Sequence, residues 1–227
     1  MPIARFRDLC MDARDALALA RFWATALDGP LVDLGDGAGR IDPPPGRSTA
    51  ERLWVNPVPE PRTVKTRVHL DLRGDPDPLV RAGATVVRAP DPDPWWVLAD
   101  PEGNEFCVFG GQPPGVVELV VDSRDPLAQA TWWAGLTGGT AQQSDRGPWA
   151  WVEGAAAFPW RYWVFNAVPE PKAAKNRLHW DVNLAGSGPA DLVAAGARIQ
   201  REPDDDIKWW IMEDPEGNEF CAFPESE

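Results

Sequence analysis

Asp-Pro-Glu-Gly-Asn-Glu-Phe-Cys occurs twice in this chain, at residues 100–107 and again at residues 214–221. Each copy follows a pair of adjacent tryptophans, Trp95-Trp96 or Trp209-Trp210. Proline followed by Gly-Asn favours a tight turn, and the residues on either side have the composition of strands. The string therefore predicts a β-hairpin, and its recurrence indicates a repeated unit.

The repeat extends over nearly the whole chain. His69 and His179 are 110 residues apart, and residues 55–72 match residues 165–182 at 9 of 18 positions without a gap. Glycine and proline are concentrated around residues 110–115, which is typical of a linker. The sequence therefore predicts one domain over residues 1–110, a linker over 111–115 and a second domain over 116–227.

Within each half the same order of elements appears twice, as one strand, one helix and three strands. In the first half we expect strands at 5–11, 31–34, 40–41, 52–58, 67–72, 85–88, 95–99 and 105–109, with helices at 12–27 and 75–82. In the second half we expect strands at 116–122, 149–152, 161–167, 177–182, 198–201, 209–212 and 219–223, with helices at 126–136 and 189–194. These assignments follow from hydrophobic periodicity and from breaker residues. They predict an α+β protein built from four β-α-β-β-β modules.

The composition excludes two classes of partner. The 35 acidic and 22 basic residues give a formal net charge of −13, which opposes binding to nucleic acid or to an anionic membrane surface. No apolar run has the length of a membrane span, and the first 14 residues lack the apolar core of a signal peptide. We expect a cytoplasmic monomer or homodimer with its three cysteines reduced.

Four such modules, with the Asp-Pro-Glu-Gly-Asn hairpin, resemble the vicinal oxygen chelate superfamily of glyoxalase I, bleomycin-resistance proteins and extradiol dioxygenases. Val-Pro-Glu-Pro at residues 58–61 and 168–171, each followed by Lys, Arg, His and Asp, is similar to its bacterial glyoxalase-like subgroup. The resemblance implies two glyoxalase-like domains, each a cup of curved mixed sheets with the helices outside. It also implies that a small molecule, and in many members a metal, binds inside the cup.

The resemblance also implies where a metal would bind. In metal-using members the ligands lie on the first and last strands of each module. The matching positions in this chain are Asp8, Asn56, His69 and Cys107 in the first half, and Glu118, Asn166, His179 and Cys221 in the second. Asp8, His69, Glu118 and His179 are the better ligands of this set, because Asn binds transition metals poorly and Cys replaces the usual carboxylate. We therefore expect no cofactor, with a divalent metal as the alternative.

Strand alternation groups the two histidines of the chain with charged neighbours. Residues two apart on a strand share a face, so Arg67, His69 and Asp71 should point into one cup. Arg177, His179 and Asp181 should do the same in the other half. One interpretation is a histidine that is oriented by a carboxylate and acts in catalysis, with an arginine to hold an anionic or carbonyl group. The other is a ladder of salt bridges that only closes the sheet.

Tryptophans on these strands are candidates for the walls of a cup. They are Trp54, Trp95, Trp96, Trp163, Trp209 and Trp210. Adjacent residues point to opposite faces, so one member of each Trp-Trp pair should face the cup and the other the helices. Aromatic walls suit a flat or cationic ligand.

Three functions are consistent with these features. The first is a small-molecule-binding protein that holds an aromatic or polycyclic ligand in a tryptophan-lined cup. The second is a metal-assisted lyase, isomerase or dioxygenase. The third is a structural protein whose cups have lost function. If only one cup is active, we expect it to be the cup of the second half, because Glu118 and several tryptophans belong to that half.

Overall fold

The computed structural model describes residues 1–225. The strands of the first half are β1 (Ala4–Ala13), β2 (Leu31–Asp33), β3 (Gly39–Ile41), β4 (Leu53–Pro57), β5 (Val68–Arg73), β6 (Thr85–Arg88), β7 (Trp95–Ala99) and β8 (Glu105–Phe109). Those of the second half are β9 (Gly115–Ser123), β10 (Thr140–Gln143), β11 (Trp149–Glu153), β12 (Tyr162–Ala167), β13 (Leu178–Leu184), β14 (Arg198–Arg201), β15 (Trp210–Glu213) and β16 (Glu219–Phe223). The helices are α1 (Ala16–Leu27), α2 (Pro76–Arg81), α3 (Pro126–Thr137) and α4 (Pro189–Ala194), with a short 3₁₀ helix at Thr49–Glu51.

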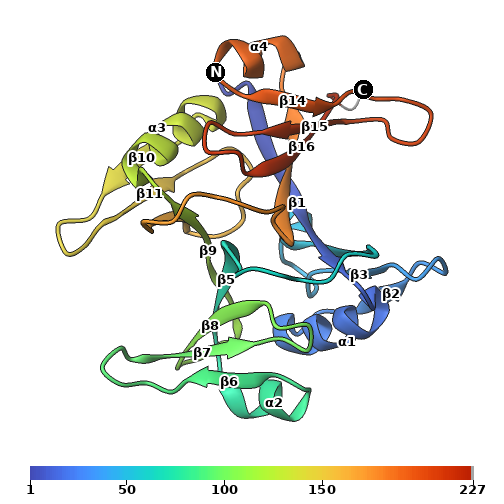
Figure 1. Ribbon diagram of the computed structural model, residues 1–227, viewed down its shortest axis with the longest axis vertical. Coiled ribbons are helices and arrows are strands. Elements are labelled where there is room, and N and C mark those ends of the chain that lie inside the picture. Colours follow the sequence, from blue (N-terminus) through green and yellow to red (C-terminus); the bar gives the residue numbers. More distant parts are fainter. Residues whose placement is uncertain (226–227) are drawn as a thin grey trace.

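The strands form two curved, mixed sheets of eight strands; in Figure 1 one extends from β14 at the top to β2 at the right, and the other from β10 at the left to β6 at the bottom. Sheet I has the order β14-β15-β16-β13-β1-β4-β3-β2, and sheet II has the order β10-β11-β12-β9-β5-β8-β7-β6. At the centre of sheet I, β1 pairs antiparallel with β13, and at the centre of sheet II, β5 pairs antiparallel with β9. Each sheet therefore combines one module from the first half of the chain with one module from the second half.

This pairing corrects the composition of the two predicted cups. The sequence repeat indicated that the two modules of one half enclose a cup together. In the structure the first module joins the fourth in sheet I, and the second joins the third in sheet II. The reason is that the two central ladders both cross between the halves, which a repeat in the sequence does not reveal.

The helices lie on the outer faces of the sheets, and the two long ones also join the sheets. Trp133 of α3 contacts Trp163 of sheet II and Trp180 of sheet I, with ring centroids 4.8 and 5.3 Å apart. In the other half, Trp23 of α1 packs on Phe106 of sheet II at 5.2 Å. The modules of one half thus share a hydrophobic core around their helix, whereas the hollows on the opposite faces of the sheets lie between the halves.

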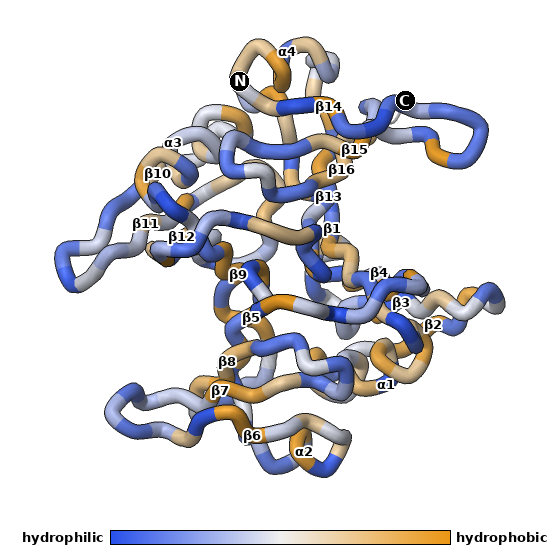
Figure 2. The backbone as a smooth tube through the Cα atoms, viewed as in Figure 1, coloured by the Kyte–Doolittle hydropathy of each residue, from blue (hydrophilic) through white to orange (hydrophobic). Residues whose placement is uncertain are grey.

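The predicted elements are confirmed, with two differences. The strand β1 continues to Ala13, so α1 begins at Ala16 and not at residue 12. Asp15 caps the helix, because its side chain accepts a hydrogen bond from the Ala18 amide. The strand β10 is polar (Thr-Ala-Gln-Gln), and its sequence pattern did not predict it. The loops that project from the sheets, such as the loop between β10 and β11, are hydrophilic (Figure 2).

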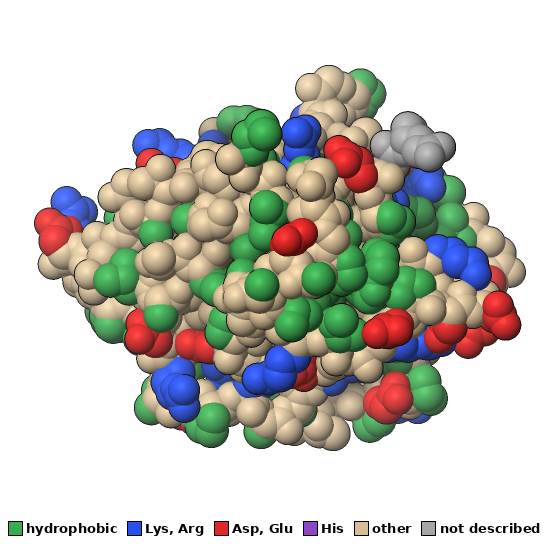
Figure 3. All heavy atoms as spheres, turned by 90° about the horizontal axis from the view of Figure 1, so that it is seen from above, with side chains coloured by type: hydrophobic (Ala, Val, Ile, Leu, Met, Phe, Trp, Pro, Cys, Tyr) green, Lys and Arg blue, Asp and Glu red, His purple; other side chains and the backbone are tan. Residues whose placement is uncertain are grey.

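None of the helices within residues 1–225 is long and apolar enough to cross a lipid bilayer. On the face shown in Figure 3, acidic and basic side chains are interspersed over the surface.

Candidate functional site

The hollow face of sheet I, which we call cup I, contains a cavity of about 470 Å³. Its walls include Trp54 of β4 and the pair of Trp209 and Phe223, whose rings stack with centroids 4.9 Å apart. His179, Asp181 and Cys221 lie at its base. A volume of this size lies in the range of small-molecule sites.

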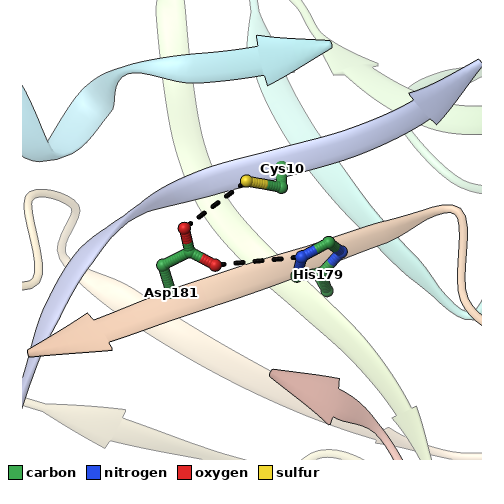
Figure 4. A group of neighbouring side chains, drawn as sticks. All are labelled: Cys10, His179 and Asp181. Atoms are coloured by element: carbon green, nitrogen blue, oxygen red, sulfur yellow. Dashed lines mark hydrogen bonds and ion pairs between the residues drawn. The ribbon is translucent and has the colours of Figure 1, made fainter. Parts of the chain in front are cut away.

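A group of polar side chains meets at the base of cup I, where β1 and β13 run side by side (Figure 4). The Cys10 thiol donates to Asp181 Oδ2 at 3.5 Å, and His179 Nε2 lies 3.8 Å from Asp181 Oδ1. Cys221 Sγ is 3.6 Å from the same His179 nitrogen. The structure therefore brings together residues that lie more than 160 positions apart in the chain.

Burial determines the protonation of this group. Burial and then the neighbouring Asp8 carboxylate raise the pKa of Asp181 well above its usual range. Burial, followed by Asp181, also raises the pKa of the Cys10 and Cys221 thiols. Burial lowers the pKa of His179. Each of these shifts favours the uncharged form of the side chain.

The face of sheet II that carries His69, which we call cup II, repeats part of this arrangement. His69 Nε2 lies 3.5 Å from Asp71 Oδ1, and Cys107 is close to both residues. Glu118 lies opposite Asp71 on the neighbouring strand β9. Burial and then the Asp71 charge raise the pKa of Glu118 to about 7. Trp95 packs on Phe109 at 5.3 Å, as Trp209 packs on Phe223 in cup I.

The residues proposed as metal ligands are therefore redistributed between the cups. Asp8 and Asn56 join His179 and Cys221 in sheet I, whereas Glu118 and Asn166 join His69 and Cys107 in sheet II. Within each half, the predicted combinations of Asp8 with His69 and of Glu118 with His179 are wrong. Half of the strands in the sheet that carries His179 therefore come from the first half of the chain.

The tryptophans divide as the alternation of a strand requires. Trp209 lines the cavity of cup I, while Trp96 and Trp210 pack against the hydrophobic core on the helix side. The inward orientation expected of Trp163 is wrong: its side chain is fully buried and stacks on Phe158, with centroids 5.3 Å apart. Its neighbours Tyr162 and Val164 take the opposite face of β12, because successive side chains alternate.

The two arginines next to the histidines do not reach the base of a cup. Arg67 donates to the main-chain oxygen atoms of Glu170 (2.9 Å) and Asp122 (3.0 Å). Arg177 donates to the main-chain oxygen of Glu60 (3.0 Å) and to the Glu102 carboxylate (3.2 Å). Each arginine therefore holds the Val-Pro-Glu-Pro connection of the other half. Both residues immediately precede their strand, β5 or β13, so the side-chain direction of the strand does not apply to them.

Cys10 and Arg7 are among the residues of cup I that were not selected from the sequence. Cys10 lies two positions after Asp8, so strand alternation already places it on the inward face. Arg7 lines the cavity as well, with its guanidinium 3.9 Å from the centre of the Phe223 ring. Arg7 lies within an irregularity of the β1–β13 register, between Phe6 and Asp8, which no sequence pattern indicated.

The comparisons with known proteins agree with this fold. A family model of the glyoxalase-like domain matches residues 8–109 and again residues 118–223. The chain therefore belongs to the glyoxalase-like domain family, within the vicinal oxygen chelate superfamily. No curated protein shows significant similarity to the sequence.

Solved structures with the same fold span nearly the whole chain. Glyoxalase I from Zea mays is 14% identical, with a TM-score of 0.64 over 96% of this chain and 92% of that one. A putative dioxygenase from Bacillus subtilis is 12% identical, with a TM-score of 0.62 over 98% of this chain and 86% of that one. At these identities the likeness establishes the fold of the glyoxalase and dioxygenase superfamily.

Proposed function

We propose that this protein binds a planar aromatic small molecule in cup I. The observation that carries the proposal is the cavity of about 470 Å³ between Trp54 on one side and the Trp209–Phe223 stack on the other. Offset stacking on such rings favours flat aromatic ligands. The polar groups below, Asp181, His179 and Cys221, supply hydrogen bonds that fix the orientation of the ligand.

A panel of planar aromatic compounds tests this proposal, with N-phenyl-1-naphthylamine as the first probe because its fluorescence rises in an apolar site. We expect saturable binding with one molecule per cup I. Trp209→Ala removes one aromatic wall and should weaken binding about tenfold. Trp132→Phe is the control, because Trp132 lies on α3 outside both cups. If the panel gives no saturable binding, a structural protein with non-functional cups becomes the better explanation.

A specific observation supports a second candidate, a metal-assisted lyase, isomerase or dioxygenase. One ligand atom from each of Cys10, His179 and Asp181 lies within 4.8 Å of the others, and His69, Asp71 and Cys107 form a similar group in cup II. Thiolate, imidazole and carboxylate are the donors that zinc prefers, and three of them leave one position open. Asp181 Oδ1 is buried and accepts no hydrogen bond from the residues described, so this donor set fits a cation.

A bound divalent metal would supply a Lewis acid that polarises a ligand oxygen. The residues of the chain would hold the ligand against it, with Trp54 and the Trp209–Phe223 pair restricting water. Metal analysis after exposure to zinc alone tests this candidate, and Cys10→Val should lower the zinc content of cup I. The position equivalent to Cys10 in cup II is Val120, so valine is a matched replacement. A protein that retains no zinc would exclude a zinc-dependent enzyme.

A further inference from the structure

Cup I adjoins a second, larger hollow in the middle of the molecule. This central cavity, of about 700 Å³, lies between residues 60–67 and 170–177, which connect one sheet to the other. Lys175 is the residue that lines both the central cavity and cup I. The Lys175 ammonium group therefore lies at the boundary between the two cavities, where a ligand in cup I would extend toward the central cavity.

The charge of Lys175 remains accessible. Its Nζ lies 2.5 Å from Asp12 Oδ2, yet 62% of its side chain is exposed to solvent. The backbone on both sides of Lys175 is held in place. Lys172 pairs with Glu219 at 2.6 Å, and the Asn176 side chain donates to Asn218 at 3.1 Å. A ligand can thus reach a solvent-exposed ammonium group on a fixed segment of backbone.

Arg7 places a second cation at the wall of cup I. Its guanidinium lies over the Phe223 ring and donates to Asn183 at 3.0 Å. The nearest carboxylate oxygen, Asp8 Oδ2, is 3.9 Å away and already accepts a hydrogen bond from Trp54. The positive charge of Arg7 is therefore only partly compensated.

The acidic residues of the same cavity are less available. Glu219 is paired with Lys172, and 8% of its side chain is exposed. Asp181 lies below Cys10 and His179, with 5% of its side chain exposed. Asp36 is exposed at the rim, where it accepts a hydrogen bond from the Ala38 amide. Two accessible cations therefore face one accessible carboxylate around an aromatic-walled cavity, in a protein whose overall charge is −13.

From this charge arrangement, which rests on the proposed function, we infer the chemical class of the ligand. We propose that cup I takes an aromatic molecule that carries an acidic group, and that Lys175 selects for that group. The aromatic part occupies the space between Trp54 and Trp209, and the acidic group points toward the central cavity. In cup II the position of Arg7 is Val117, so the same preference is weaker there.

Two fluorescent dyes that differ only in one sulfonate test the proposal. They are 8-anilinonaphthalene-1-sulfonate and its uncharged parent, N-phenyl-1-naphthylamine. We expect the sulfonated dye to bind more tightly and to lose affinity as salt is added, because salt screens charges near the surface. Lys175→Met should weaken the sulfonated dye about threefold to fivefold, as expected for a partly exposed charge pair, and should leave the parent dye unchanged.

Lys65→Met is the matched control. Lys65 occupies the equivalent position in the other half, pairs with Asp122 at 2.8 Å and is 66% exposed. The variant has the same change in net charge, but its side chain does not line cup I. Arg7→Met should weaken the sulfonated dye less than Lys175→Met does, because Arg7 does not line the central cavity toward which the acidic group points. Unchanged binding of the parent dye shows that both variants are folded.

The outcomes separate this inference from the proposed function. If both dyes bind with equal affinity, or if Lys175→Met and Lys65→Met behave alike, the charge selection is refuted while aromatic binding in cup I stands. If neither dye binds in a saturable way that Trp209→Ala weakens, both proposals are refuted.

Discussion

Single residues in the two cups follow the alternation of a β-strand wherever they lie inside a ladder. His179 and Asp181 both belong to β13 and face the cavity of cup I, as their spacing predicted. Trp180, between them, is fully buried against α3 on the other face. Arg177 lies one position before the strand and turns to the connection between the sheets instead. The pattern thus holds as far as the hydrogen-bonded ladder extends.

Glu118 provides a pH-dependent prediction at this scale. Its folded-state pKa of about 7 lies above the ordinary value of 4.5, so the folded state holds the proton more tightly than the unfolded state. Ionising Glu118 therefore costs more free energy in the folded state than in the unfolded state. The free energy of unfolding is higher at low pH and falls as the pH rises from about 4.5 through about 7. Glu118→Gln should stabilise the protein by about 3 kcal/mol at pH 8 and by much less at pH 5.

Urea unfolding at both pH values measures this difference. Glu202→Gln, at an exposed position, is the control for the loss of one carboxylate. An equal effect of Glu118→Gln at pH 5 and pH 8 would show that Glu118 titrates normally.

At the scale of elements, the repeated hairpin turn attaches each sheet to a helix. Asp214 Oδ1 accepts from the amides of Glu216 and Asn218 at 2.9 Å each, which closes the turn around Gly217 (φ 85°). Its other oxygen accepts from Gln129 of α3 at 2.6 Å. The same motif that predicted the hairpin therefore also positions the helix, through contacts that sequence spacing alone does not show.

Glu216 carries the element-scale prediction. Its carboxylate accepts from the Arg124 and Asp125 amides and from the Ser123 hydroxyl, just before α3 begins. Glu216→Ala leaves these donors without a protein partner and should lower the free energy of unfolding by about 1 to 2 kcal/mol. Thermal or urea unfolding measures the loss, with Glu170→Ala at an exposed position as the control. If Glu216→Ala lowers the free energy of unfolding no more than Glu170→Ala does, water replaces the Glu216 carboxylate at the N-terminus of α3.

For the whole molecule, we propose that residues 1–110 and 116–227 are two packing units and that both cups lie where the units meet. Trp23 and Phe106 pack in the first unit, and Trp133 and Trp180 pack in the second. The ladders β1–β13 and β5–β9 cross between the units at the centre of each sheet. The two reciprocal arginine contacts cross between them as well.

A protease site inserted between Gly111 and Gln112 tests this arrangement in the full-length chain. After cleavage we expect the two fragments to elute together at the size of the intact protein, because two central ladders and an extensive core join them. Dye binding in cup I should survive the cut. The Glu216→Ala protein, cut in the same way, controls for general loss of stability. Fragments that separate and still bind dye would contradict a cup that is shared between the halves.

The sequence by itself determined the repeated module, the order of its elements, the turn chemistry and the inward face of the histidine strands. These features follow from local rules: a period of two along a strand, and prolines and glycines at turns. Only the tertiary structure decided which modules pair, and with it that Asp8, Cys10 and Trp54 complete the cup of His179. Strand pairing between distant segments depends on how whole faces bury their apolar side chains, and two similar modules offer more than one such pairing.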